Sequence, residues 1–207
     1  MISNEYISDK LKNTYNFSVN DIDKISKFCR ELLYFNKKYN LISKSTEKSI
    51  LHRHVLDSAQ LLAFFKFKEG SSLSDLGTGG GFPGLILAIA NKSKSFHVKL
   101  YEKSSVKCDF LRKTIKKLKI NQCKVIEGDL RSNKINSDII VCRAFRKLEE
   151  ILKISRENCK KPHKIIILKG KDAQAEVNKA LMNFTFKYKL NDSVTEKSSK
   201  ILIIEAY

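Results

Sequence analysis

The sequence predicts an α/β protein with a mostly parallel seven-stranded sheet, preceded by a helical cap and completed by an antiparallel hairpin. After Gly70, short apolar runs alternate with longer amphipathic segments, and strand–helix–strand repetition favours right-handed parallel crossovers. The first five runs are nearly continuous in apolar character, which is typical of parallel strands covered on both faces. Only a short polar link separates the last two runs, which favours a hairpin.

The 207 residues are enough for one substantial core, so we predict a single domain with a cap over 1–68 and an α/β core over 69–207. Apolar side chains recur at helical spacing in residues 20–39, and Asn20 is a suitable N-cap. The stripe consists of Ile22, Ile25, Phe28, Cys29, Leu32 and Leu33. A second helix is predicted from about Glu47 to Phe65.

Seven apolar runs mark the predicted strands. They are 71–77, 97–103, 123–129, 138–145, 164–170, 184–190 and 200–207. A helix is predicted over Ser104–Leu118, with an apolar stripe of Val106, Phe110, Leu111, Ile115 and Leu118. The link 191–199 is too short for a helical crossover, so the last two strands are expected to pair at or near the sheet edge.

Charge is the most distinctive bulk property of the chain. The formal net charge of +18 attracts polyanions, so nucleic acid is the leading partner. Most of the basic residues are lysine, and the chain is also rich in isoleucine and asparagine, so AT-rich coding is an alternative source of the surplus. An extended binding surface therefore needs more evidence than the total.

Compartment and metal content are indicated by two further features. Five cysteines occur without a CxxC pair or a histidine at ligand spacing, which indicates reduced thiols and no metal site. No apolar run approaches the roughly 20 residues that span a bilayer, and the first residues lack the order of a signal peptide. We expect a cytoplasmic protein without membrane contact.

A glycine cluster marks the predicted binding site. The stretch SDLGTGGGFPG, residues 74–84, holds five of the eight glycines and follows the first predicted strand. Glycine permits positive φ and close approach of a ligand to the backbone. In an open parallel sheet, the crevice beyond the first strand binds nucleotide-like ligands. An ordinary strand-to-helix turn would need only one or two glycines.

The residues around this cluster favour one class of ligand. Gly79-x-Gly81-x-x-Gly84 also fits the dinucleotide pattern, which is weak evidence alone. Glu102, at the end of the second strand, is placed to accept hydrogen bonds from the ribose of NAD or of S-adenosylmethionine. Pro83 removes an amide and Phe82 adds a ring where a pyrophosphate needs free N–H groups. An adenosyl ligand without phosphates is therefore favoured over NAD.

Three polar positions near the cleft have two possible roles each. Asp75 could face a cationic ligand or bond to the turn. Gly128-Asp129 ends the third strand, where the carboxylate could accept a hydrogen bond from an adenine amine or belong to a plain turn. Arg143 follows the fourth strand, where it is either an ion-pair partner or a site residue.

The ordered set NLIS (40–43), HRHVLDS (52–58), DLGTGGGFPG (75–84), RAF (143–145) and LKG (168–170) resembles the RsmG (GidB) family. These are bacterial methyltransferases that modify guanine N7 in small-subunit ribosomal RNA. The resemblance extends from about residue 20 to residue 170. It implies a class I methyltransferase (Rossmann-like) fold, S-adenosyl-L-methionine as donor, and a guanine in the decoding-region loop of 16S rRNA as target.

The resemblance also implies site residues. By motif position the cofactor contacts are Gly77, Phe82, Gly128, Asp129 and Arg143. The cluster and the second strand add Gly79 and Glu102, although the family often has Asp at the latter position. The expected partner is 16S rRNA or the small ribosomal subunit, bound by a monomer. An RNA-binding protein of the same fold without transfer activity remains the alternative.

The implied chemistry needs no general base, because guanine N7 has a lone pair and no proton to lose. We therefore expect no general base, assign no catalytic residue, and assign Arg143 to positioning of donor or acceptor. His54, Asp57 and Ser58 share a helical face and are expected to form a polar cluster. The candidate phosphate contacts are Arg53, Arg146, Lys169 and Lys171. Phe145 could stack on a base or pack in the core.

Overall fold

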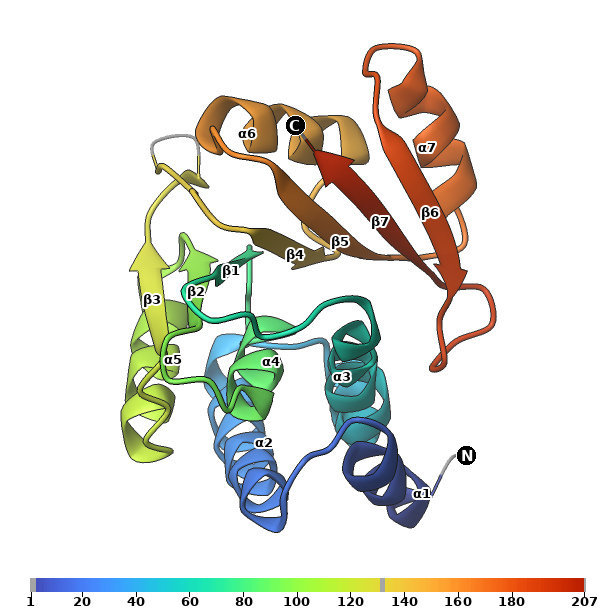
Figure 1. The fold of residues 1–207 in the computed structure, drawn as a ribbon. Helices are drawn as coiled ribbons and strands as arrows, with labels where there is room; N and C mark the ends of the chain where they lie inside the picture. Colours follow the sequence, from blue (N-terminus) through green and yellow to red (C-terminus); the bar gives the residue numbers. More distant parts are fainter. Residues whose placement is uncertain (1–2, 131–132, 207) are drawn as a thin grey trace.

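The computed structural model describes residues 3–130 and 133–206, which form a seven-stranded sheet in the order β3-β2-β1-β4-β5-β7-β6 (Figure 1). The strands are β1 (Ser72–Leu76), β2 (His97–Glu102), β3 (Cys123–Glu127), β4 (Ile139–Arg143), β5 (His163–Lys169), β6 (Lys187–Asp192) and β7 (Lys200–Ala206). The first five strands pair in parallel, while β7 pairs antiparallel with β5 and β6. The predicted parallel sheet and terminal hairpin are confirmed.

Strand β6 begins three residues later than its apolar run predicts. The Phe184 amide donates to the carbonyl of Ala180, 2.9 Å away, so it still belongs to the end of the preceding helix. Phe184 and Phe186 pack against the core beneath that helix. Phe184 therefore belongs to the turn that ends the helix Ala173–Leu181, and the run joins the sheet only from Lys187 onward.

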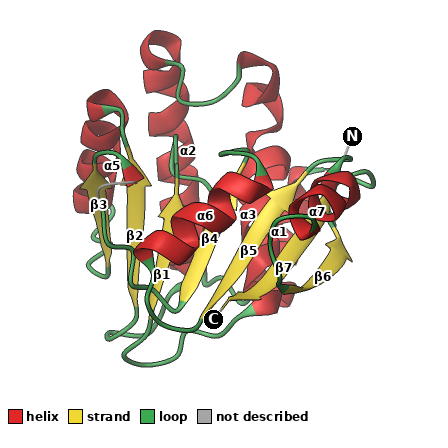
Figure 2. Cartoon of the chain, turned by 90° about the horizontal axis from the view of Figure 1, so that it is seen from above, coloured by secondary structure: helices red, strands yellow, loops and turns green. Residues whose placement is uncertain are grey.

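Helices cover both faces of the sheet (Figure 2). The helices α2 (Val19–Tyr39), α4 (Gly84–Ala90) and α5 (Ser105–Lys117) lie on one face, and α6 (Leu148–Asn158) and α7 (Ala173–Leu181) on the other. Because successive side chains of a strand point to opposite faces, Ile139 and Val141 of β4 join the first core while Ile140 and Cys142 join the second.

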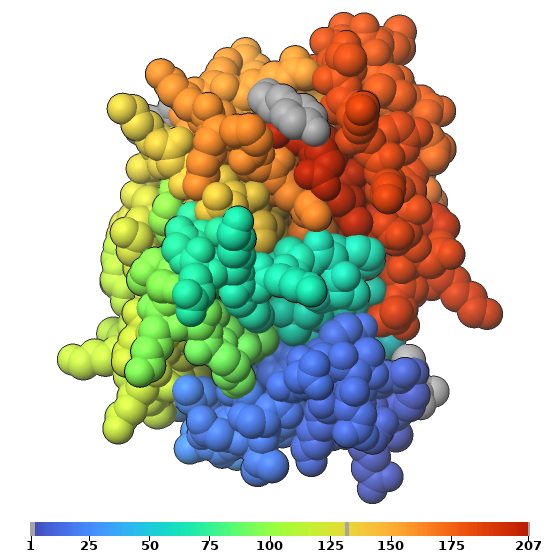
Figure 3. Space-filling model, viewed as in Figure 1, coloured from blue at the N-terminus to red at the C-terminus, as the bar shows by residue number. Residues whose placement is uncertain are grey.

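The N-terminal helices pack beneath the β1–α4 region, blue against green and teal in Figure 3. A short helix, α1 (Asn4–Asp9), continues into a single wide turn at Lys10–Thr14 and precedes α2. The Asp21 amide donates to Ser18 Oγ at 3.2 Å, and the Ser18 amide donates to Asp21 Oδ2 at 2.7 Å. This reciprocal capping box makes Ser18 the N-cap, so the prediction of Asn20 is wrong by two residues.

The segment predicted as one helix from about Glu47 to Phe65 is helical throughout, but its hydrogen-bond spacing changes along its length. It comprises a 3₁₀ segment at Lys44–Ser49, a π segment at Leu51–Leu56, α3 (Asp57–Ala59) and a second 3₁₀ segment at Gln60–Phe64. The Ser58 hydroxyl donates to the His54 carbonyl at 2.6 Å. Such side-chain bonds compete with regular helix geometry.

Helix α5 buries the predicted stripe except at Val106, since Phe110, Leu111 and Leu118 are buried and Ile115 packs against the core. Cys108, Leu111 and Thr114 are buried, whereas Val106 is 43% exposed. With about 100° of rotation per residue, Val106 lies off the face that these three residues define. The described residues contain no helix that is long and apolar enough to cross a membrane.

Asn36 gives a test of how the segments of the cap are joined to one another. This buried side chain donates to Glu47 Oε1 at 2.6 Å and accepts from the Ile42 amide at 2.8 Å. Asn36→Ala leaves both partners unsatisfied, so we expect a loss of about 1–3 kcal/mol in the free energy of unfolding, measured with urea. The control Asn13→Ala, which removes an exposed contact to Asp9, should change it by less than about 0.5 kcal/mol. Equal effects would contradict the assignment.

Candidate active site

The glycine turn is held against the second strand. The amides of Gly77 and Thr78 both donate to the Tyr101 carbonyl at 3.0 Å. Gly77 and Gly79 have φ angles of +70° and +58°, which glycine adopts without strain. A Cβ at Gly77 would lie 2.1 Å from the Phe145 ring, whereas a Cβ at Gly79 would meet only the Gly77 carbonyl, at 3.9 Å. The turn therefore presents bare backbone toward open space at Gly79.

Asp75 bonds to the turn. Its carboxylate is fully buried and accepts a hydrogen bond from the Gly84 amide at 2.7 Å. Burial raises the pKa of Asp75 to about 6, and the Gly84 hydrogen bond and the charge of Arg143 partly oppose this rise. Of the two roles that the sequence left open, the structural bond is the one observed.

The head of α4 offers no free amides to a pyrophosphate. Besides the Gly84 bond to Asp75, the Leu85 amide donates to the Gly81 carbonyl at 2.9 Å. The amides of Ile86 and Leu87 both donate to the carbonyl of Pro83, at 3.1 and 3.2 Å. A phosphate site at a helix N-terminus needs such amides to be unbonded, so this turn suits a ligand without phosphates.

A cavity of about 550 Å³ opens at the carboxyl ends of β1, β2 and β4, and we call it the first cavity. All seven predicted cofactor contacts line it, and they are Gly77, Gly79, Phe82, Glu102, Gly128, Asp129 and Arg143. Leu41, Ile42 and Ser43, which follow α2, form another part of its wall. The structure thus brings together residues that are up to about one hundred positions apart in the sequence.

Glu102 is oriented by backbone amides. Its Oε1 accepts from Lys103 and Ser104, both at 2.9 Å, and its Oε2 accepts from Gly79 at 3.0 Å. An ionised carboxylate offers about four acceptor positions, so capacity for ribose hydroxyls remains. The Gly128 amide donates to the Glu102 carbonyl at 3.0 Å, which places Gly128 beside this carboxylate.

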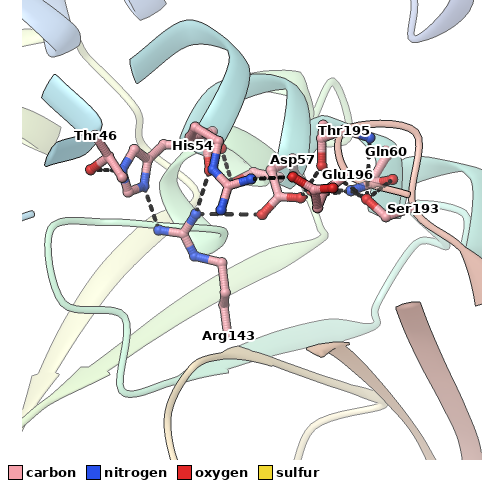
Figure 4. Close-up of polar contacts among 10 residues, drawn as sticks. Thr46, His54, Asp57, Gln60, Arg143, Ser193, Thr195 and Glu196 are labelled. Carbon is pink, nitrogen blue, oxygen red and sulfur yellow. Dashed lines mark hydrogen bonds and ion pairs between the residues drawn. The ribbon is translucent and has the colours of Figure 1, made fainter. Parts of the chain in front are cut away.

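Arg143 is bound to the helical segment before the sheet (Figure 4). It donates to His54 Nδ1 at 2.6 Å and to the Arg53 carbonyl at 2.9 Å, and it pairs with Asp57 Oδ2 at 3.5 Å. The guanidinium lies 5.4 Å from the centre of the Phe82 ring. His54 and Asp57 form the predicted polar cluster, but they do so through Arg143.

His54 is held as a neutral acceptor. Burial, together with the positive charges of Arg143 and Arg53, lowers the pKa of His54 to about 3. Because Nδ1 accepts from Arg143, Nε2 carries the proton and donates to Thr46 Oγ1 at 2.8 Å. The Thr46 hydroxyl in turn donates to the Ser43 carbonyl at 2.8 Å. This series of hydrogen bonds fixes the orientation of Arg143 without placing a positively charged imidazole beside it.

The link between β6 and β7 braces the same network. Asp57 Oδ1 accepts from Thr195 at 2.7 Å and from Gln60 at 2.9 Å, and the Gln60 side chain accepts from the Val194 amide at 2.9 Å. Thr46, Gln60 and Thr195 were not predicted as parts of the site, because no local sequence pattern distinguishes them from other polar residues.

A second cavity of about 590 Å³ adjoins the first and lies over the ends of β4 and β5. The two share His54, Arg143, Ala144, Phe145 and Arg146 as a common wall. The Arg146 guanidinium lies 5.1 Å from the Phe145 ring centre, and Arg146 Nε is buried without a partner among the described residues. The wall therefore carries aromatic and cationic groups that face both cavities.

The predicted phosphate contacts differ in their accessibility. Arg53 and Lys171 are exposed, although Arg53 pairs with Glu196 at 3.3 Å. Arg146 pairs with Glu150 and is partly buried. Lys169 lines the second cavity, and its 9% exposed side chain pairs with Glu176 at 2.7 Å, so its contact with phosphate stays a prediction.

The described residues contain no group of three potential ligands that could hold a metal ion. The five cysteines are buried and unpaired, as expected from their spacing. Burial raises the pKa of the Cys142 thiol, beside the site, to about 12. The Cys142 thiol is therefore protonated and unreactive at neutral pH.

The strand order, the glycine turn after β1 and the carboxylate at the end of β2 define a class I S-adenosylmethionine-dependent methyltransferase. Solved structures of this class share the fold. A SAM-dependent methyltransferase from Aquifex aeolicus matches with a TM-score of 0.61 and 17% identity, over 78% of this chain and 94% of its own. An RNA methyltransferase from Salinibacter ruber, solved with S-adenosyl-L-homocysteine, matches with a TM-score of 0.54 and 15% identity, over 72% and 88%.

Sequence comparison narrows the class to one family. The family model described as "GidB: rRNA small subunit methyltransferase G" matches residues 21–204. Ribosomal RNA small subunit methyltransferase G of Pelagibacter ubique is 36% identical over 82% of this chain and 81% of its own length. The protein of that name in Orientia tsutsugamushi is 34% identical over 97% and 98%. The chain belongs to the GidB family of small-subunit rRNA methyltransferases, and its methyl donor is S-adenosyl-L-methionine.

The first cavity fits this donor. A Cβ at Gly79 would occupy space that no protein atom fills, and Glu102 is held where ribose hydroxyls can reach it. No cluster of unbonded amides for a pyrophosphate is present at the head of α4. These features match an adenosyl group that carries a sulfonium in place of phosphates.

Asp75 gives a pH-dependent test of the turn. The acid titrates near pH 3.8 when exposed and near pH 6 in the fold, so between these values the folded state binds more protons and stability falls as pH rises. Asp75→Asn removes this contribution and keeps an oxygen acceptor for Gly84. We expect the stability of the wild type relative to the variant to decrease by roughly 3 kcal/mol as pH rises through this window, measured by urea unfolding. A pH-independent difference would contradict burial of the carboxylate.

Proposed function

We propose that this chain transfers a methyl group from S-adenosyl-L-methionine to N7 of a guanine in the decoding-region loop of 16S rRNA. The observation that carries the proposal is the pair of adjoining cavities with Arg143 in their common wall. The donor supplies an electrophilic methyl group from the first cavity. The acceptor base enters the second cavity, so that its N7 faces the methyl group at the place where the two cavities join.

The first cavity binds the donor through backbone and one carboxylate. The turn at Gly77 and Gly79 lies against the adenosyl part, and Glu102 accepts from the ribose hydroxyls. Gly128 and Asp129 border the adenine, and Phe82 closes the cavity beside Arg143. The contacts at Gly77, Gly79 and Gly128 use main chain, because a residue without a Cβ lets the donor approach the backbone closely.

Arg143 positions the reactants. Its bonds to His54, Arg53 and Asp57 hold the guanidinium at the boundary of both cavities, where it orients the donor carboxylate or guanine O6. A lone pair attacks the methyl and no proton is removed, so the reaction needs alignment rather than a base. The low pKa of His54 agrees with this, since both ring nitrogens are already engaged.

The packing supports the proposed domain organisation, and the charge supports the proposed RNA partner. The cap over 1–68 and the core over 69–207 share one hydrophobic cluster, which supports a single domain. The net charge of +18 supports direct contact with rRNA, through Arg53, Arg146 and Lys169, which line the second cavity, and through the exposed Lys171. We infer that the chain acts as a cytoplasmic monomer on 16S rRNA or on the small subunit.

A transfer assay tests the reaction. The chain is incubated with labelled S-adenosyl-L-methionine and with unmodified small subunits or their naked RNA, and the modified position is mapped by cleavage at N7-methylguanine. We expect label in one guanine of the decoding-region loop. Cofactor binding without any transfer to either substrate would favour an RNA-binding protein of the same fold.

The turn can be tested with two matched glycine substitutions. Gly79 and Gly70 both have positive φ, and a Cβ at Gly70 meets no atom within 4 Å. We expect Gly79→Ala and Gly70→Ala to lose about 1–2 kcal/mol of stability each through backbone strain. Only Gly79→Ala should weaken donor binding, by about tenfold or more in titration calorimetry, because its methyl enters the first cavity. Equal donor affinity in both variants would contradict the placement.

A further inference from the structure

Helices α2 and α5 form a surface that borders the first cavity (Figure 1). They pack through Phe35 and Phe110, whose ring centres are 5.4 Å apart, and through the Glu31–Lys117 ion pair at 2.6 Å. The cavity wall is completed by residues 41–43, directly after α2, and by residues 103 and 107, at the start of α5. The end of α2 and the beginning of α5 therefore meet at the cavity.

An aromatic ring stands exposed on this surface. Tyr34 is 70% exposed, and its ring meets Phe35 edge-on, with centres 5.6 Å apart. Phe35 also stacks on Tyr39 at 6.2 Å and rests on Phe110, so the exposed ring is supported by a packed aromatic group. Lys38 lies over the Tyr39 ring at 5.3 Å, which leaves Tyr34 as the ring with an open face.

Apolar and basic groups continue from Tyr34 toward the first cavity. Val106, which the helical pattern assigns to the core, is instead exposed beside Lys103 and Lys107. We call this surface the α2–α5 face, and it consists of Tyr34, Lys38, Tyr39, Lys103, Val106 and Lys107.

Helices α2 and α5 carry a surplus of positive charge, and three of the six residues of the α2–α5 face are lysines. Each acidic residue of the two helices is paired with a basic one, in the contacts Asp21–Lys92, Asp23–Lys27, Glu31–Lys117 and Asp109–Arg112. The helices carry further basic residues beyond these pairs, which are Lys24, Arg30, Lys37, Lys38, Lys107, Lys113 and Lys116. An open aromatic ring among surplus cations is typical of surfaces that bind single-stranded nucleic acid, where bases stack and phosphates are neutralised.

We propose that the α2–α5 face is a platform for unpaired nucleotides that flank the methylated base. This rests on the proposed function and adds to it a second contact region for the RNA. Tyr34 stacks on a base, while Lys38, Lys103 and Lys107 lie near its phosphates. The helix rises about 1.5 Å per residue, so Tyr34 lies about 7.5 Å along α2 from Tyr39, the last helical residue before the cavity wall at residues 41–43, a span of roughly two stacked nucleotides. A duplex hides its base faces, so the platform selects single strands.

Tyr34→Ala tests the platform. The probe is a single-stranded RNA of about a dozen nucleotides that carries 2-aminopurine, whose fluorescence falls when the base stacks. We expect RNA affinity to weaken about fivefold to a hundredfold and the fluorescence change to be lost. Tyr34→Phe keeps the ring and should keep both signals. The control is Tyr6→Ala, which removes a 48% exposed ring of α1 that is covered by Lys10 at 5.6 Å and so differs from the open ring of Tyr34.

The outcomes separate the platform from the proposed function. Unchanged affinity and fluorescence in Tyr34→Ala would overturn the platform, as would equal binding of a duplex of the same composition. Normal RNA binding with slower methylation of assembled subunits alone would also overturn it, since the face would then contact a ribosomal protein. Donor binding and thermal unfolding are measured in parallel. If the wild type fails to bind donor or transfer methyl, the proposed function fails instead.

Discussion

The hydrogen bond from the Gly84 amide to the buried carboxylate of Asp75 fixes where the chain leaves β1 and enters α4. This bond places the head of the helix so close to the sheet that a Cβ at Gly84 would lie 2.4 Å from Leu100. The glycine turn must then pass through left-handed backbone, and its main chain becomes the floor of the first cavity. Donor binding thus depends on a contact that no ligand touches.

The second determinant is the set of hydrogen-bond acceptors around Arg143, one of which is the neutral imidazole of His54. A guanidinium that is mostly enclosed needs acceptors, and the structure supplies an imidazole, a carbonyl and one carboxylate. With His54 kept uncharged, the cluster holds Arg143 firmly without adding a base to the site. This arrangement agrees with a transfer in which charge moves from sulfur to a purine and no proton is taken up.

The sequence predicted the sheet, and its candidate donor contacts line one cavity, because both depend on local patterns. Continuous apolar runs identify β1 to β5, and the glycine cluster with Glu102 identifies the first cavity. The sequence did not predict the contacts that residues far apart in the chain make with one another. The acceptors of Arg143 are about ninety positions away, and the burial of Lys169 depends on Glu176 in the next helix. The regular helix predicted near Glu47 is altered by side-chain bonds that periodicity does not reveal.

The link between β6 and β7 lies at the far edge of the sheet, yet Thr195, Val194 and Glu196 hold Asp57, Gln60 and Arg53. Every other described group in this network precedes the link in the chain. During synthesis from the N-terminus, the growing polypeptide therefore carries a nearly finished pocket whose outer brace has not yet been made. Because β7 follows the link and lies between β5 and β6, the brace of the pocket and the completed sheet are both added at the end of synthesis.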